Sequence, residues 1–345
     1  MERQKYWKNR KVFITGATGL LGPWIIKKLC SYGARVVVLL RDLDPWSLCA
    51  QENLLEYVTV IQGDLLDYHL LLRILNEQEI ETIFHLGAQA IVGHANRSPI
   101  STFKSNIEGT WNLLEACRLS PWIKEVVLAS SDKAYGEQKT LPYTEDMSLQ
   151  GIHPYDVSKS CTDLIAQSYA KTYKVPVAIT RCGNFFGGGD LHFNRIIPGT
   201  IYSLLHHERP VIRSDGTLIR DYIYVKDVVD GYLTLAEQLQ EKELAGQAFN
   251  LSTDKPLRVI DVVRAIIDRM GISDLQPIIT NRASNEIPAQ HLSSKKARDV
   301  LQWSPQWGFD KGIQETIIWY TDHFMQAEKK LKKYIERFGE GSHAL

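Results

Sequence analysis

Thr15-Gly-Ala-Thr-Gly-Leu-Leu-Gly22 is the stretch of sequence that decides the fold. It lies between an apolar run at Lys11–Thr15, which is typical of a buried strand, and an amphipathic pattern at Leu20–Tyr32, which predicts a helix. The three glycines let the backbone approach a pyrophosphate at the start of that helix, where amides and the helix dipole favour anions. The segment therefore predicts a dinucleotide-binding turn, although its spacing is G-x-x-G-x-x-G rather than G-x-G-x-x-G.

Strand and helix patterns alternate outward from this turn. After a helix stop at Gly33, strands are expected at Arg35–Leu40, Val58–Ile61, Thr82–Leu86, Val126–Ser130 and Val175–Arg181, and helices at Leu70–Asn76, Thr102–Leu119 and Tyr155–Tyr173. This alternation predicts an α/β fold of the Rossmann type, with a doubly wound parallel sheet covered on both faces.

The pattern changes after Arg181, where glycine-rich turns separate shorter elements. Further helices are expected near Val259–Met270, Ser293–Leu301 and from Gln314 onward. We therefore predict a dinucleotide-binding domain over residues 1–182 and a smaller C-terminal α/β lobe for the substrate over residues 183–345. This division allows some segments after residue 182 to return to the first domain.

The overall composition gives little support for a macromolecular or membrane partner. The 345 residues include 40 basic and 40 acidic side chains, so no net charge favours nucleic acid or an anionic membrane. Five cysteines without C-x-x-C spacing, and the lack of an apolar run near ~20 residues, favour a cytoplasmic protein with reduced thiols. The expected ligand is a small molecule.

The end of the second strand bears on which dinucleotide binds. An acid at this point usually binds the adenosine ribose, whereas an arginine accommodates a 2′-phosphate. Leu40 occupies the acid's position and Arg41 follows, which favours NADP, while Asp42 keeps NAD possible. Arg41 could alternatively be an ordinary surface residue. Asp64, after the next strand, could border the adenine or cap a helix.

Tyr155 and Lys159 are candidates for redox chemistry on an alcohol. Four residues apart on a helix, they share one face, and Pro154 is compatible with a helix start. A nearby ammonium should lower the tyrosine pKa from about 10 towards working pH, so that the phenolate can take an alcohol proton. Ser131, at the end of the strand Val126–Ser130, could bond the reacting oxygen or simply cap a turn.

Asp132 and Lys133 suggest a second reaction at the same site. Oxidation at one carbon acidifies the proton on the neighbouring carbon, and loss of water then requires one group to remove that proton and another to protonate the leaving hydroxyl. A carboxyl and an amine side by side could supply both functions. The alternative is a solvated Asp-Lys turn.

Together these residues resemble the extended short-chain dehydrogenase/reductase family, and within it the nucleotide-sugar 4,6-dehydratases, the CDP-glucose enzymes being nearest. The narrower motifs are Ser130-Ser-Asp-Lys-Ala-Tyr135, Gly183-Asn-Phe-Phe-Gly-Gly-Gly-Asp190 and Trp303-Ser-Pro-Gln-Trp-Gly308. The resemblance covers nearly the whole chain. It implies an NAD(P)-dependent lyase that forms a 4-keto-6-deoxy sugar nucleotide and needs no metal ion.

The resemblance also implies roles for individual residues. Tyr155 would take the proton from the sugar O4, Lys159 would hold the cofactor ribose, and Ser131 would steady O4. Asp132 would protonate the C6 hydroxyl and Lys133 would remove the C5 proton. The residues expected to bind substrate are Gln89, Ser131, Asp132, Asn184, Arg195, Arg213 and Arg220. Those expected to bind cofactor are Gly16, Thr18, Gly19, Leu20, Leu21, Gly22, Arg41, Asp42, Asp64, Leu65, Leu86, Ala88, Gln89, Asn106, Tyr155 and Lys159.

Several alternatives stay open at this point. Each arginine could form a surface or interdomain salt bridge, and Gln89 and Asn106 could satisfy backbone groups. Gly93-His94 stands where the CDP-glucose enzymes have an arginine, and Ile219-Arg-Asp-Tyr222 matches the wider dehydratase and epimerase pattern, which weakens the choice of nucleotide. A nucleotide-sugar 4-epimerase is the main alternative, followed by a sugar-uronate decarboxylase and a non-catalytic redox sensor. The resemblance also implies a homodimer through the helices at Thr102–Leu119 and Tyr155–Tyr173.

Overall fold

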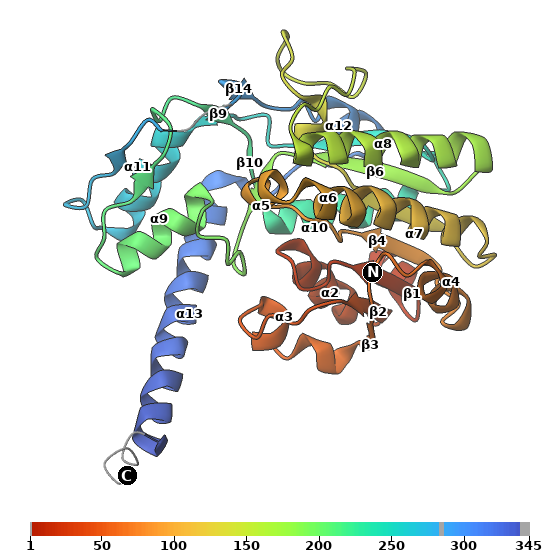
Figure 1. Ribbon diagram of the computed structural model, residues 1–345, viewed down its shortest axis with the longest axis horizontal. Helices are drawn as coiled ribbons and strands as arrows, with labels where there is room; N and C mark the ends of the chain where they lie inside the picture. The colour runs from red at the N-terminus through yellow and green to blue at the C-terminus, as the bar shows by residue number, and fades with distance from the viewer. Residues whose placement is uncertain (1, 283–285, 339–345) are drawn as a thin grey trace.

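A seven-stranded sheet forms the centre of the protein in the computed structural model, which describes residues 2–282 and 286–338 (Figure 1). Every neighbouring pair of strands in it is parallel. The spatial order is β11-β6-β5-β4-β1-β2-β3. The strands are β1 (Lys11–Thr15), β2 (Arg35–Leu40), β3 (Thr59–Gln62), β4 (Thr82–His85), β5 (Glu125–Ala129), β6 (Val177–Cys182) and β11 (Ala248–Leu251).

The winding of the sheet reverses between β1 and β4, which lie side by side although β2 and β3 intervene in the sequence. In doubly wound sheets, ligands bind beside such a reversal, at the carboxyl ends of the strands. The glycine turn follows β1 and Leu86 follows β4, so both predicted cofactor segments lie at this edge. The predicted doubly wound α/β fold is confirmed.

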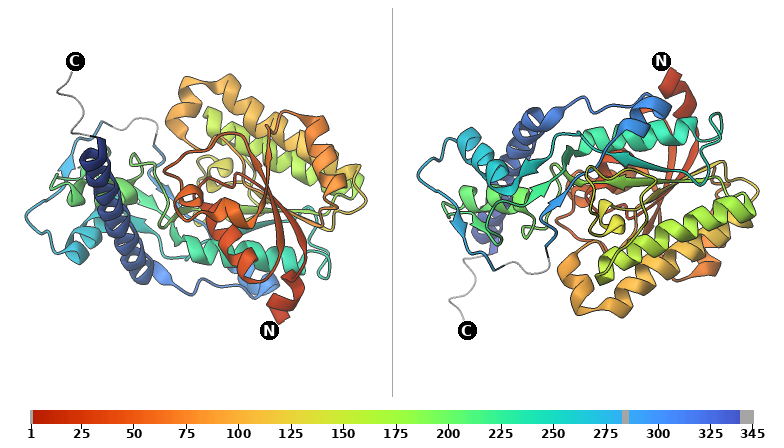
Figure 2. Two further views of the ribbon diagram at one scale, coloured as in Figure 1. Left: turned by 90° about the horizontal axis from the view of Figure 1, so that it is seen from below. Right: turned by 90° about the horizontal axis from the view of Figure 1, so that it is seen from above.

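Helices cover both faces of the sheet (Figures 1 and 2). One face packs against α4 (Tyr68–Glu77), α7 (Gly109–Arg118) and α8 (Pro154–Tyr173), and the other against α2 (Leu21–Ser31) and α10 (Val225–Gln238). Alternate residues of one strand enter opposite cores, because successive side chains of a strand point to opposite faces. In β1, Phe13 belongs to the first core and Ile14 to the second.

The remaining helices are short or lie at the periphery of the sheet. They are α1 (Glu2–Trp7), α3 (Leu48–Gln51), η1 (Leu54–Tyr57), α5 (Val92–Arg97), α6 (Pro99–Phe103), η2 (Lys104–Glu108) and η3 (Asp132–Tyr135). The single helix predicted over Thr102–Leu119 is in fact α6, a π-helical turn η2 and then α7. Apolar spacing does not reveal such a turn, because the residues on either side keep a helical period.

The C-terminal lobe is built from short strands and helices beside the main sheet. Its strands are β7 (Asn184–Phe186), β8 (Val211–Ile212), β9 (Ile219–Arg220), β10 (Tyr222–Tyr224), β12 (Leu257–Arg258), β13 (Ile278–Ile279) and β14 (Ala289–Gln290). Its helices are α9 (Ile196–Leu205), α11 (Val259–Met270) and α13 (Gly308–Phe338), and α13 extends away from the body of the molecule (Figure 1). The helix α12 (Lys295–Leu301) instead packs against β11 and α10 at the main sheet.

The lobe and the sheet share one apolar core. The cluster that holds Val12 and Ile14 of β1 also holds Ile201 of α9, Ile266 of α11 and Tyr320 of α13. Moreover, β11 returns from the later part of the chain to the edge of the main sheet. No helix among the described residues is long and apolar enough to cross a lipid bilayer.

Close backbone approach explains two of the three glycines in the turn after β1. Gly16 has φ +73°, and a Cβ there would lie 2.7 Å from the backbone of Gly87. A Cβ at Gly22 would lie 2.5 Å from the carbonyl oxygen of Gly16, so the turn and α2 could not pack as they do. Gly19 is exposed, and a Cβ there would be 3.4 Å from the nearest atom, Gly16 O. The backbone around Gly19 is therefore open to a ligand.

We expect Gly22→Ala and Gly19→Ala to separate folding from cofactor binding. Gly22→Ala should lower the free energy of unfolding by about 1–3 kcal/mol, since the new methyl group overlaps the turn. Gly19→Ala should leave that free energy unchanged within about 1 kcal/mol but weaken dinucleotide binding, because it fills the open side of the turn. Thermal unfolding and isothermal titration with NAD and NADP measure both effects. Equal stability of the two variants would contradict this account.

Candidate active site

Lys159 holds the N-terminal half of α8 against the end of β5. Its Nζ donates a hydrogen bond to the carbonyl oxygen of Ala129 at 2.7 Å, and the side chain is buried. Tyr155, one turn earlier on α8, lies within hydrogen-bonding reach of Ser131, just beyond β5. The structure thus brings Ser131, Tyr155 and Lys159 to the carboxyl edge of the sheet, as predicted from the sequence.

The titration of Tyr155 differs from the sequence-based expectation. Removal from water raises the pKa of Tyr155 to about 12, and the hydrogen bond from Ser131 and the charge of Arg195 offset only part of this rise. Burial also lowers the pKa of Lys159 to about 8, which the charge of Asp163 partly opposes. The phenol of Tyr155 is therefore protonated near neutral pH in the ligand-free protein, and the expected lowering of its pKa is wrong for this state.

Ser131, Asp132 and Lys133 form a compact turn at the start of η3. The Ser131 hydroxyl donates to Asp132 Oδ1 at 3.0 Å and accepts from the backbone N–H of Lys133 at 3.2 Å. Asp132 is buried, and its Oδ2 atom has no hydrogen-bond partner among the described residues. Burial raises the pKa of Asp132, against the lowering effect of Lys133. A carboxyl group in this state can donate a proton to a ligand hydroxyl.

Gln290 joins this turn to the C-terminal lobe. Lys133 Nζ donates to Gln290 Oε1 at 2.6 Å, and Gln290 Nε2 donates to the carbonyl oxygen of Asp132 at 3.0 Å. Gln290 is fully buried on β14. Sequence reasoning missed it, because it belongs to no recognisable motif and is 157 residues from Lys133.

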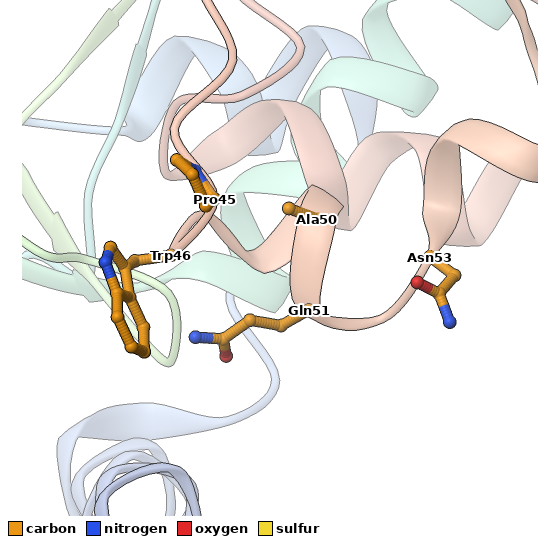
Figure 3. A pocket seen from close by; sticks show the side chains of 5 residues that line it. All are labelled: Pro45, Trp46, Ala50, Gln51 and Asn53. Atoms are coloured by element: carbon orange, nitrogen blue, oxygen red, sulfur yellow. The ribbon is translucent and has the colours of Figure 1, made fainter. Parts of the chain in front are cut away.

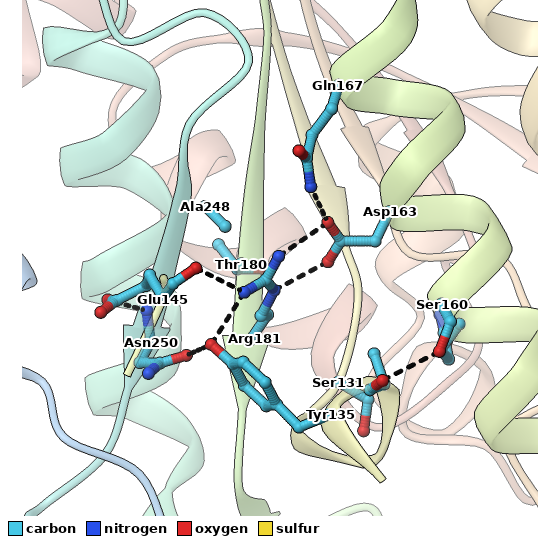
Figure 4. A network of polar contacts seen from close by, with 12 residues as sticks. Ser131, Tyr135, Glu145, Ser160, Asp163, Gln167, Thr180, Arg181, Ala248 and Asn250 are labelled. Carbon is cyan, nitrogen blue, oxygen red and sulfur yellow. Dashed lines mark hydrogen bonds and ion pairs between the residues drawn. The ribbon is translucent and has the colours of Figure 1, made fainter. Parts of the chain in front are cut away.

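A buried ion pair holds α8, β6 and η3 together (Figure 4). Arg181 of β6 binds Asp163 of α8 through two hydrogen bonds of 2.8 and 2.9 Å, and both side chains are almost inaccessible to water. Arg181 also donates to the hydroxyl of Tyr135 on η3 at 2.8 Å, and Tyr135 donates to Asn250 of β11 at 2.8 Å. The network fixes the helix that carries Tyr155 relative to the turn that carries Ser131.

The cofactor end fits a dinucleotide. The open turn of Thr18, Gly19 and Leu20 precedes α2, whose first residues are Leu21 and Gly22, and the backbone N–H groups of a helix start favour a pyrophosphate. Leu86 and Ala88 follow β4 on the other side of the reversal, and a Cβ at Gly87 would touch Leu65.

The side chains of Arg41, Asp42 and Asp64, which follow β2 and β3, form hydrogen bonds or ion pairs with near neighbours in the sequence. Arg41 and Asp42 form an exposed ion pair with each other at 2.6 Å. Asp64 accepts from the N–H of Leu66 at 2.9 Å, and Asp67, rather than Asp64, caps α4.

The side chains of Asn106 and Gln89 form hydrogen bonds with backbone groups. This is the alternative to ligand binding that the sequence leaves open for both residues. Asn106 Oδ1 accepts from the N–H of Gln89 at 2.7 Å, and Nδ2 donates to the Gln89 carbonyl oxygen and to Ser158 Oγ. Gln89 Oε1 accepts from the N–H of Ile91 at 3.1 Å. Asn106 lies in the π-helical turn η2 and so joins the segment after β4 to α8.

The four residues predicted to bind the diphosphate and base of the substrate differ from one another in their surroundings. Arg220 of β9 lowers the pKa of Asp132, and Arg195 lowers that of Tyr155, so both charges face the reactive groups. Arg220 also pairs with Glu286 at 2.9 Å, and Arg195 with Asp190 at 3.1 Å. Asn184 is exposed and donates to the Asp221 carbonyl oxygen.

Arg213 is the fourth of these predicted ligands. It donates to the carbonyl oxygen of Asn194 at 2.7 Å and is exposed.

A pocket of about 320 Å³ lies elsewhere, beyond the end of β2 (Figure 3). It is lined by Pro45, Trp46, Ala50, Gln51 and Asn53. None of these is a predicted site residue, and Gln51 contacts His323 of α13. No group of three or more His, Cys, Asp or Glu side chains in the described ranges is arranged to hold a metal ion. We therefore base the candidate site on the geometry around Ser131 and Tyr155.

The comparisons of this chain with known proteins agree on one family. Residues 13–316 match the family model of GDP-mannose 4,6-dehydratase. The CDP-glucose 4,6-dehydratase of Salmonella typhimurium is 28% identical to this chain over 331 residues, which cover 92% of each protein.

Two solved structures have similar folds. The NAD complex of dTDP-glucose 4,6-dehydratase from Bacillus anthracis aligns with a TM-score of 0.80 and 23% identity, over 91% of this chain and 97% of that one. UDP-glucose 4-epimerase from Thermotoga maritima, solved with UDP-glucose, aligns with a TM-score of 0.83 and 26% identity, over 91% and 99%. Dehydratases and epimerases thus share this fold.

We expect Asp163→Ala to destabilise the protein strongly. The substitution leaves the guanidinium of Arg181 buried without its partner, which typically costs about 3–5 kcal/mol. Gln167→Ala is the matched control, because Gln167 donates to the same carboxylate at 2.7 Å from the same helix but is only partly buried. It should cost about 1 kcal/mol. Urea unfolding measures both, and similar losses for the two variants would contradict a structural role for the ion pair.

Proposed function

The chain belongs to the GDP-mannose 4,6-dehydratase family, and we propose that it converts a CDP-hexose, with CDP-glucose as the leading candidate, into the 4-keto-6-deoxy sugar nucleotide. It is an enzyme of the NAD(P)-dependent nucleotide-sugar dehydratases, which are lyases. The observation that carries the proposal is the grouping of Ser131, Asp132 and Lys133 beside Tyr155. CDP is proposed because the Salmonella relative acts on CDP-glucose and the Asp-Lys pair resembles that group of enzymes.

Tyr155 is proposed to start the reaction by accepting the proton of the sugar O4. Ser131, which lies within hydrogen-bonding reach of Tyr155, would hold the same oxygen. A bound NAD(P) would supply the hydride acceptor for C4 and the hydride donor for C6. Lys159, with its lowered pKa, would hold the cofactor ribose and support the charge on Tyr155.

Asp132 and Lys133 are proposed to remove water from the 4-keto sugar. The carbonyl at C4 acidifies the C5 proton, which Lys133 would accept. Asp132 would give its proton to the C6 hydroxyl, which leaves as water. The raised pKa of Asp132 and its free Oδ2 support this role, because a buried carboxyl stays protonated to a higher pH. Lys133 would then return a proton to C5.

The cofactor-binding set is proposed as predicted from the sequence, with the turn at residues 16–22 as its anion site. A preference for NADP, which Arg41 suggests, stays a proposal and requires Arg41 to leave its ion pair with Asp42. The Bacillus anthracis dehydratase of similar fold was solved with NAD. Either dinucleotide is compatible with the proposed chemistry.

The C-terminal lobe, from residue 183 onward, is proposed to bind the nucleotide diphosphate. Arg220 and Arg195 are the best-supported ligands, because their charges act on Asp132 and Tyr155. A guanidinium can bind a diphosphate through two parallel hydrogen bonds. Asn184 and Arg213 are proposed to border the nucleotide more remotely.

A nucleotide-sugar 4-epimerase is the second candidate, favoured by the structural similarity to UDP-glucose 4-epimerase. An epimerase needs only the C4 chemistry of Tyr155 and Ser131. It gives no role to a buried carboxyl next to an amine, with one oxygen that has no partner among the described residues, which is why we place the dehydratase first.

We expect the purified protein to convert CDP-glucose into a product with the alkali-induced absorbance of a 4-keto sugar. In D₂O, the product should carry deuterium at C5, because the C5 proton is exchanged during loss of water. UDP-, GDP- and dTDP-sugars form the comparison panel. An epimerised product without C5 deuterium would instead support the 4-epimerase, and inactivity on every sugar would refute both candidates.

Tyr155→Phe is the control for this assay. It should abolish turnover while cofactor binding measured by titration is retained, because only the phenolic oxygen is removed. Loss of cofactor binding in this variant would mean that the tyrosine has a structural role.

We also propose that the protein is a homodimer formed through α7 and α8. Trp111 of α7 and Leu164 of α8 are large apolar side chains with 42% and 54% of their surface exposed, and the two helices pack side by side. An apolar surface of this kind favours association.

Static light scattering should give twice the chain mass for the native protein and one chain mass for Leu164→Glu. The exposed Trp46, in the pocket beyond β2, supplies a control as Trp46→Glu, which should keep the native mass. A native protein with the mass of one chain would refute the dimer.

A further inference from the structure

Gln290 of β14 uses both ends of its amide on the turn that carries Asp132 and Lys133. We infer that Gln290 is a positioning residue that aims the amine of Lys133 at the sugar C5 in the elimination step. This inference rests on the proposed dehydratase function. The side-chain hydrogen bonds of Gln290 go to Lys133 and Asp132, the residues proposed for the second half of the reaction.

The contacts of Gln290 fix the position of Lys133 closely. The carboxamide oxygen accepts from Lys133 Nζ at 2.6 Å, and the carboxamide nitrogen donates to the Asp132 carbonyl oxygen at 3.0 Å. Because the side chain is fully buried, rotating it would break both bonds without replacement by water. A lysine side chain has four rotatable bonds, and this contact restricts them.

The backbone of Gln290 is itself held in place. In the parallel pair of β9 and β14, Gln290 lies in register with Arg220. Two residues later, the N–H of Leu292 donates to the buried carboxylate of Asp221 at 2.7 Å. The strand that presents the amide is thus anchored to the same segment that presents a proposed diphosphate ligand.

The amide is suited to this role because it accepts a hydrogen bond without adding charge. Lys133 already faces the carboxyl groups of Asp132 on its own turn and of Asp156 on α8, while Arg220 on β9 acts on Asp132. A carboxylate at position 290 would add a third acidic group beside Lys133, whereas the amide adds none. Gln290 therefore holds Lys133 in place without changing the charge around it.

Two variants test this inference in the full-length protein with cofactor and the sugar nucleotide that the wild type converts. Gln290→Met removes both hydrogen bonds at similar volume, and Gln290→Glu keeps an acceptor but adds charge. Rapid-mixing absorbance of the reduced nicotinamide reports C4 oxidation, and deuterium exchange at C5 reports the elimination step. Lys133→Met defines the complete loss of the base.

We expect Gln290→Met to slow C5 exchange by about 10- to 100-fold, because a base displaced by about 1 Å loses this much. C4 oxidation should stay near the wild-type rate, so reduced cofactor accumulates during turnover. Gln290→Glu keeps the acceptor for Lys133 Nζ but loses the donor to the Asp132 carbonyl oxygen, so it should slow C5 exchange selectively by a smaller factor than Gln290→Met. This variant also serves if Gln290→Met fails to fold.

Gln138→Met is the matched control. The amide of Gln138 also braces η3, by donating to the Tyr135 carbonyl oxygen at 2.6 Å, but its bonds are to backbone oxygens away from Lys133. It should change stability without changing the ratio of the two rates.

Three outcomes would overturn the inference. Equal slowing of both steps in Gln290→Met would show a structural role only, and a wild-type rate of C5 exchange in Gln290→Glu would show that the contacts of residue 290 do not position the base. A wild-type protein that forms no keto product from any sugar nucleotide would refute the proposed function itself, and the inference with it.

Discussion

The buried ion pair between Arg181 and Asp163 is the interaction on which the arrangement of the site depends. It joins β6, the strand next to the edge of the sheet, to α8, and through Tyr135 it reaches η3, so three elements of the site meet at one guanidinium. Asp163 lies one helical turn after Lys159, and its negative charge partly offsets the effect of burial on the pKa of that lysine. The pair therefore sets the position of α8 and influences the pKa of Lys159, a proposed cofactor ligand.

Burying a charged group lowers the stability of a folded protein. The proposed chemistry explains why such groups are buried here. Asp132 has one oxygen without a partner among the described residues, and Lys159 is buried against a single carbonyl oxygen. Unsatisfied polar atoms in a protein interior typically reduce stability by about 1–3 kcal/mol each. A site that must bind several hydroxyl groups and move protons needs such unsatisfied atoms, and the surrounding apolar cores offset their cost.

The residues that could be predicted from the sequence are those whose placement depends on local pattern. The glycine turn, the pair Tyr155 and Lys159, and Ser131 at a strand end all follow from helical period, strand period and the common edge of a parallel sheet. The partner of Lys133 could not be predicted, because β14 reaches η3 only through the tertiary fold. The raised pKa of Tyr155 was missed for a related reason, since it depends on burial by distant segments rather than on a neighbour in the helix. The π-helical turn at Lys104–Glu108 leaves no trace in the apolar period.

The shared apolar core of the sheet and the C-terminal lobe limits how the enzyme can open. Separating the two halves as rigid bodies would expose side chains from α9, α11 and α13 that pack in the same cluster as those of β1. Entry and departure of a nucleotide sugar must then be achieved by local excursions of surface loops. An enzyme built in this way can acquire a different sugar preference through changes confined to those loops, while its interior is preserved.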